Sequence, residues 1–209
     1  MAHTDNPATP SLRTAPARRL AAWPCGAPAL LLAGICLLPA APARAQWTAP
    51  DTSPAMYLQY GAAEHDADSW TLGATLPWRD WRRGLWGGVL TGYWDLWAGR
   101  WSAPLEGSRR GTWVIGVNPT LRWRGQGGQS RWFTEAGVGL SWALNRRYVT
   151  DEKEFPTRYN FATHIGMGYL FGSQGQHEIA LRLEHHSNAG IKKPNPGENF
   201  LQLRYARHF

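Results

Sequence analysis

The chain has 209 residues, a formal net charge of +7 and an aromatic content of 12%, which includes 13 tryptophans. Both cysteines, Cys25 and Cys36, lie within the first 45 residues. If that segment is removed, the rest of the chain has neither a disulfide nor thiolate chemistry.

Residues 1–45 have the features of an export signal. A basic region at 13–19 precedes an apolar run at 29–38, which is too short to span a membrane. The small-x-small sequence Ala43-Arg44-Ala45 fits a cleavage site directly before Gln46. We therefore predict that 1–45 is a signal peptide.

The predicted mature chain, residues 46–209, has a length that suits a single domain. It keeps 18 basic and 14 acidic residues, a net charge of +4, and 12 of the tryptophans. Because an exported protein does not meet nucleic acid, the modest basic charge favours an anionic lipid surface as the partner. Tryptophans in such number are typical of membrane–water interfaces.

Eight segments of the mature chain alternate in residue character with the period of a strand. In several of them one face has tryptophan at both ends and aliphatic residues between, as in lipid-facing strands that run between two aromatic girdles. The opposite faces carry small and polar residues, which suit the filled interior of a narrow barrel. We predict an all-β protein, an eight-stranded antiparallel transmembrane β-barrel over 46–209. The predicted strands are 54–63, 68–78, 84–96, 111–123, 130–142, 159–171, 177–187 and 200–209.

The connections between these segments alternate in length, as expected for short periplasmic turns and longer outer loops. Short turns are predicted at 79–83, 124–129 and 172–176, and the third–fourth, fifth–sixth and seventh–eighth connections are longer. The first–second connection, 64–67, is short and fits this pattern less well. Solvation of the longer loops and binding of lipid phosphates explain their basic residues equally well. Those residues are Arg100, Arg109, Arg110, Arg146, Arg147, Lys153, Lys192 and Lys193.

The last segment alternates in character and ends on Phe209. This ending resembles the terminal-strand signal that the bacterial outer-membrane assembly machinery recognises. Together with the export signal, it predicts an outer-membrane location and that machinery as a partner.

The segment 177–187 places His185 and Ser187 on its apolar face, about 6–7 Å apart along the strand. At that spacing the imidazole can act as general base on the hydroxyl. In a membrane barrel this face meets lipid, where two polar groups call for a functional explanation. Glu184 and His186 point to the interior, so the adjacent histidines cannot share an ion, and we predict neither a metal nor a cofactor.

The run His185-His186-Ser187-Asn188-Ala189-Gly190-Ile191-Lys192-Lys193-Pro194-Asn195 resembles the signature of the lipid A 3-O-deacylases, the PagL family. The resemblance implies an outer-membrane barrel that acts as a serine esterase on the 3-O-linked acyl chain of lipid A in lipopolysaccharide. By the match, His185 is the general base and Ser187 the nucleophile. The Asn188 side chain and the Gly190 N–H would form the oxyanion hole.

The resemblance also implies a glutamate, shortly before the last strand, that orients the histidine. Glu198 is the candidate for this role. Counting without a gap puts Asn199 at that position, and if Leu201 faces lipid then 199 does too, while 198 points inward. A bulge at the start of the strand would bring Glu198 outward. Both Glu198 and Asn199 therefore remain candidates.

Two hypotheses of a non-enzymatic protein compete with the esterase. One is a small outer-membrane barrel that binds lipopolysaccharide through its basic loops, and the other is a soluble ligand-binding barrel in the periplasm. The outward apolar faces with tryptophan at their ends disfavour the periplasmic barrel. The His185–Ser187 pair and its continuation through 188–190 disfavour the non-enzymatic membrane barrel.

Overall fold

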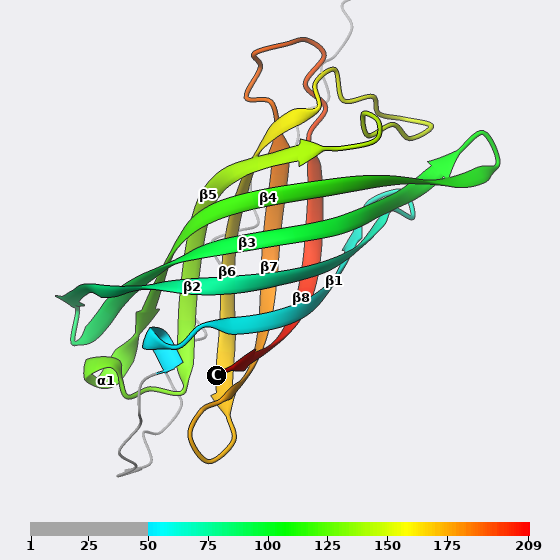
Figure 1. The fold of residues 1–209 in the computed structure, drawn as a ribbon. Helices are drawn as coiled ribbons and strands as arrows, with labels where there is room; N and C mark the ends of the chain where they lie inside the picture. The colour runs from blue at the N-terminus through cyan, green and yellow to red at the C-terminus, as the bar shows by residue number, and fades with distance from the viewer. Residues whose placement is uncertain (1–49) are drawn as a thin grey trace, which may run out of the picture. The chain divides into compact units, whose positions relative to one another are not determined.

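The computed structural model describes residues 50–209 (Figure 1). The predicted signal peptide, 1–45, and the first residues of the predicted mature chain lie outside the described residues. No helix within 50–209 is both long enough and apolar enough to cross a membrane.

Eight antiparallel strands close into a barrel in sequence order, with β8 pairing back onto β1 (Figure 1). This confirms the predicted fold class, and β1 and β5 to β8 begin and end within two residues of the predicted bounds. A short 3-10 helix, η1 (Pro50–Thr52), precedes the barrel, and a helical turn, α1 (Gly125–Gly128), connects β4 to β5. The strands are β1 (Ala55–Ala63), β2 (Asp68–Leu85), β3 (Gly88–Leu105), β4 (Ser108–Arg124), β5 (Trp132–Ala143), β6 (Tyr159–Phe171), β7 (His177–Ser187) and β8 (Glu198–His208).

The predicted turn at 79–83 is wrong, because β2 continues through it. Its pairing with β3 shifts register between Pro77 and Arg82, and the chain reverses only at Trp86 and Gly87, both of which have positive φ. The irregular pairing breaks the alternation of residue character that marked the strand in the sequence. In the sequence this break looks like the end of a strand.

The predicted long third–fourth connection is also wrong. β3 and β4 stay paired as far as Leu105 and Ser108, around a two-residue turn. The end of this hairpin extends beyond the lipid-facing part of the barrel, so its strands stay paired but carry no apolar face that would reveal them in the sequence. One consequence is that Arg100, Arg109 and Arg110 lie on strands rather than in a loop.

The outer end of the barrel is identified by its connections. Phe209 hydrogen-bonds the backbone of Pro54, so the first and last strands meet at the end that also holds the β2–β3, β4–β5 and β6–β7 turns. In outer-membrane barrels the short turns lie on the periplasmic side. The opposite end, with the loops 144–158 and 188–197, is therefore the outer one (Figure 1).

The apolar face of the sheet points outward, as predicted. Leu72, Val138 and Ile165 are each more than half exposed. Tryptophans near the strand ends, among them Trp70 and Trp113, lie on the same outward face. An apolar surface ringed by aromatic side chains is what a barrel presents to lipid.

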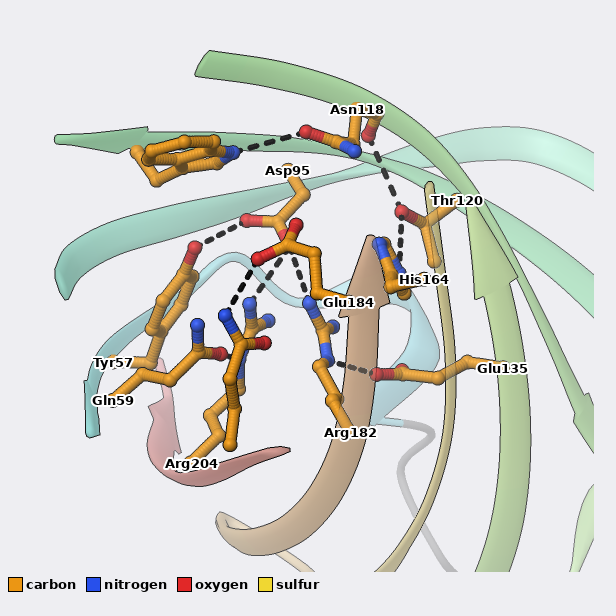
Figure 2. Close-up of polar contacts among 12 residues, drawn as sticks. Tyr57, Gln59, Asp95, Asn118, Thr120, Glu135, His164, Arg182, Glu184 and Arg204 are labelled. Carbon is orange, nitrogen blue, oxygen red and sulfur yellow. Dashed lines mark hydrogen bonds and ion pairs between the residues drawn. The ribbon is translucent and has the colours of Figure 1, made fainter. Parts of the chain in front are cut away.

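Buried ion pairs fill the barrel interior. Arg182 donates to Asp95 at 2.9 Å and to Glu135 at 2.5 Å. Arg204 also donates to Asp95, and its guanidinium lies 3.5 Å from the centre of the Tyr57 ring. Figure 2 shows these side chains converging from different strands. These four charged side chains thus each have an opposite charge within hydrogen-bonding distance, which the low dielectric of such a site demands. Arg122 and Glu178 extend the network.

The loop 144–158 folds back over the outer mouth. Tyr148 and Phe155 are almost fully buried, and the Tyr148 ring meets Trp101 edge-on at 5.3 Å. The Tyr148 hydroxyl donates to Glu198, and burial together with that neighbouring carboxylate raises the pKa of Tyr148 well above its usual value. The tyrosine therefore stays protonated and holds the loop to the start of β8.

Candidate active site

Strand β7 carries the predicted His–Ser pair on its lipid-facing side. His185 is exposed and Ser187 half-buried on the outward face, while His186 between them is buried. This facing follows from the period of two of the strand, since Arg182 and Glu184 on the other face belong to the interior. Among the described residues, no hydrogen bond joins Ser187 to the His185 imidazole. In enzymes without bound substrate, the hydrogen bond between nucleophile and base is often long or not formed.

Strand β8 supplies the partner of the imidazole. His185 and Asn199 lie directly opposite in the β7–β8 ladder, and Nδ1 of His185 is 2.7 Å from Oδ1 of Asn199. An amide oxygen only accepts hydrogen bonds, so Nδ1 carries the hydrogen and donates it. The other ring nitrogen, Nε2, keeps its lone pair and can act as a base.

Glu198 lies on the opposite face of β8 and is not brought to His185. It is only 2% exposed, and it accepts from the Tyr148 hydroxyl at 3.1 Å and from the Lys153 ammonium at 3.0 Å. The bulge that would turn Glu198 outward is absent, because the pairing of β7 with β8 runs without interruption from 198 onward. Strand parity therefore assigns Glu198 to the loop contact and Asn199 to the histidine.

Gly197 was missed by the sequence analysis. It has a positive φ of 68°, and a Cβ built on it would come within 2.9 Å of Cε1 of His185. The backbone of the last loop therefore lies against the imidazole, where a side chain would displace the ring. The Pro196-Gly197 dipeptide directly before a strand was the available signal.

The predicted oxyanion-hole residues hydrogen-bond each other. The Gly190 N–H donates to Oδ1 of Asn188 at 2.9 Å, and Nδ2 of Asn188 donates to the Lys192 carbonyl at 2.9 Å. The Asn188 N–H donates to the side chain of Asn195. In this arrangement Asn188 organises the loop 188–195, and the Gly190 N–H is occupied.

An apolar groove begins one strand away from Ser187. Ser187 pairs with Phe161 of β6, and Phe161 pairs with Leu140 of β5, so the three lie in one row across the sheet. Leu140 lines an outward groove of about 490 Å³. Since neighbouring strands are about 4.8 Å apart, Leu140 lies roughly 10 Å from the serine. Its other lining residues include Ile115, Val117, Trp142 and Tyr159.

The outward apolar face, the aromatic girdles and the filled interior define an integral outer-membrane β-barrel. On its lipid-facing side it carries a serine and a histidine that is hydrogen-bonded to an amide.

Comparisons with known proteins agree with this class. Residues 68–208 match the family model described as Lipid A 3-O-deacylase (PagL). The chain is 35% identical to Lipid A deacylase PagL of Bordetella bronchiseptica over 182 residues, which cover 85% of this chain and 95% of that protein. It is 34% identical to Lipid A deacylase PagL of Pseudomonas aeruginosa, over 69% of this chain and 80% of the relative.

The fold is also similar to that of a solved structure. The crystal structure of the outer membrane enzyme PagL superposes with a TM-score of 0.62 at 29% identity, covering 73% of this chain and 98% of the other. The chain therefore belongs to the PagL family of lipid A 3-O-deacylases and is an outer-membrane enzyme.

Proposed function

We propose that this lipid A deacylase is a serine esterase in which Ser187 is the nucleophile, His185 the general base and Asn199 the residue that orients the histidine. The hydrogen bond between His185 and Asn199 on the lipid-facing side carries this assignment. It leaves Nε2 of His185 as the basic nitrogen, on the face of β7 that also holds Ser187.

In the proposed reaction, the Ser187 oxygen attacks the ester carbonyl at the 3-position of lipid A while its proton passes to His185. The tetrahedral intermediate collapses, and the departing sugar oxygen takes that proton. Water then hydrolyses the acyl-enzyme, with His185 again accepting a proton and returning it to Ser187. The products are a free fatty acid and a lipid A that lacks one acyl chain.

Asn188 and Gly190 are the proposed donors to the oxyanion. One hydrogen of the Asn188 amide remains beyond the one given to Lys192. The Gly190 N–H must exchange its bond to the Asn188 oxygen for one to the substrate. We propose that this exchange accompanies substrate binding, so that the hole is completed only when the ester is in place.

We propose further that the groove at Leu140 takes the acyl chain that is removed, because the row through Phe161 leads to it from Ser187. We also propose that residues 1–45 are cleaved on export and that the assembly machinery inserts the barrel through its terminal strand. N-terminal sequencing of membrane-bound protein should then begin at Gln46.

Mass spectrometry of lipid A from cells that express the chain tests the assignment. Lipid A should lose the mass of one 3-O-linked acyl chain, and Ser187→Ala or His185→Ala should abolish that loss. Thr134→Ala, which removes another hydroxyl from the lipid-facing side of β5, is the matched control and should leave deacylation unchanged. Deacylation by folded Ser187→Ala would show that another residue is the nucleophile, while the family assignment would stand.

A further inference from the structure

A second groove lies on the lipid-facing surface of the barrel, across β1 to β4. It has a volume of about 460 Å³, and its apolar lining comprises Leu58, Leu72, Ala98, Trp70 and Trp113. Ala98 forms its low floor, because Leu72 stands directly opposite it in the ladder on one side and Ile115 on the other. An apolar groove on a lipid-facing surface fits an acyl chain.

Arg100 stands near the outer end of this groove, next to Ser102 and Asp68 in its lining. It lies two residues beyond Ala98 on the same face of β3, and it pairs with Trp70 on one side and Trp113 on the other. Its guanidinium lies over Gly111, where a Cβ would come within 2.3 Å of Nε. The missing side chain at Gly111 therefore makes room for the arginine at the level of the tryptophans.

The charge of Arg100 is not neutralised by the protein. Within the described part of the chain, no carboxylate or other group hydrogen-bonds its guanidinium. The nearby Asp68 is paired with Arg109, so these three residues carry one positive charge in excess. An unpaired arginine on a lipid-facing surface is costly, and such residues mark sites for a ligand of opposite charge.

The position of the groove keeps it separate from the catalytic residues. β3 and β7 are four strands apart in either direction around the closed ring, so Arg100 and Ser187 lie on opposite sides of the barrel. A lipid in this groove cannot present its ester to Ser187.

The contact between Tyr60 and Trp70, whose ring centres are 4.9 Å apart, places the groove mouth within an aromatic belt near the outer end of β2. At that depth a lipid of the outer leaflet would have its headgroup at Arg100 and its chains over Ala98. We propose that this groove is a second, non-catalytic lipid site, which binds a phosphorylated acyl glycolipid of the lipid A class by one phosphate at Arg100 and one acyl chain along Ala98.

Native mass spectrometry of the mature chain in mild detergent tests the proposal, with a Ser187→Ala background to prevent turnover. Bisphosphorylated lipid A should be retained at two molecules per barrel, and phosphate-free lipid A should fill the second site poorly. Arg100→Gln should weaken the second binding event about tenfold, since a charge-assisted hydrogen bond is lost. Arg79→Gln removes a charge from an exposed arginine elsewhere on β2 and should change nothing.

Two further variants separate the parts of the site. Ala98→Trp fills the channel and should remove the second lipid whatever its headgroup, while Arg100→Lys keeps the charge and should retain part of the binding. In the otherwise native chain, Arg100→Gln should deacylate lipid A in detergent micelles at the parent rate, because the groove is remote from Ser187.

Three results would overturn the proposal. The first is an unchanged second binding event in folded Arg100→Gln. The second is retention of phosphatidylglycerol as strong as that of lipid A, which would make the groove a general phospholipid contact. The third is a change in oligomeric state in Ala98→Trp without loss of lipid, which would make this surface a contact between copies of the chain.

Discussion

A single strand position separates the two candidates for the residue that orients His185. Glu198 and Asn199 are neighbours in sequence, yet β8 sends one into the barrel and the other to the lipid-facing side. An amide in place of a carboxylate fixes the tautomer of the histidine but adds no charge to stabilise the imidazolium. The proposed site therefore works with orientation alone.

This assignment predicts a large loss of turnover from substitution of Asn199 and little change from substitution of Glu198. Asn199→Ala should lower turnover by up to roughly 10⁴, the cost of a misplaced or wrongly protonated histidine. Glu198→Gln should leave turnover within a few-fold of the parent, because its partners are Tyr148 and Lys153. Asn199→Asp, which places a carboxylate beside His185, should turn over at least as fast as the parent.

Steady-state kinetics on lipid A in detergent micelles, with folding checked for each variant, decides between them. A large loss in Glu198→Gln together with normal turnover in Asn199→Ala would reverse the roles of the two residues. If neither variant matters, Ser187 and His185 act as a dyad.

At the scale of elements, strands β4 to β6 form the groove that the proposed reaction uses for the acyl chain. Leu140→Trp should fill this groove beside Phe161 and lower kcat/KM for long-chain substrates about tenfold, since each buried methylene contributes about 0.8 kcal/mol. Short-chain esters should react at the parent rate. Comparison of esters of increasing chain length provides the measurement.

Val138→Trp is the matched control, because Val138 lies on the same face of β5 but does not line the groove. Equal loss for short and long chains in Leu140→Trp would indicate damage to the catalytic residues. An unchanged chain-length profile would place the acyl chain elsewhere.

At the scale of the whole barrel, the charged side chains are paired with one another in the interior, and the apolar side chains face lipid. Arg182 joins two carboxylates that come from different strands, and its loss leaves Asp95 and Glu135 each with one fewer positive partner. Arg182→Met should therefore reduce the stability of the barrel by about 3–5 kcal/mol, the usual cost of breaking a buried pair.

The measurement is urea unfolding in detergent, in which the folded fraction is monitored by the heat-modifiable shift on gel electrophoresis. Arg207→Met, at an exposed outward position of β8, should unfold like the parent. A stability for Arg182→Met equal to that of Arg207→Met would mean that the interior network is not needed to close the barrel.

Alternation along the strands, taken with the export-signal features of 1–45, the tryptophans at the strand ends and the terminal Phe209, predicted the barrel and its outward apolar face. Alternation alone predicted the shared face of His185 and Ser187. Alternation is a local property, since neighbouring side chains of any strand point to opposite sides. For the same reason the sequence already placed Glu184 and His186 in the interior.

The tertiary structure decided what depends on pairing between strands. Only the unbroken β7–β8 register shows that Asn199, not Glu198, meets the histidine, and only the long β3–β4 hairpin moves Arg100 from a predicted loop to the lipid-facing wall. The approach of Gly197 to the imidazole likewise depends on how the last loop returns to the barrel. The register between strands and the path of the last loop are set by contacts between residues distant in the chain. Local periodicity of the sequence does not predict such contacts.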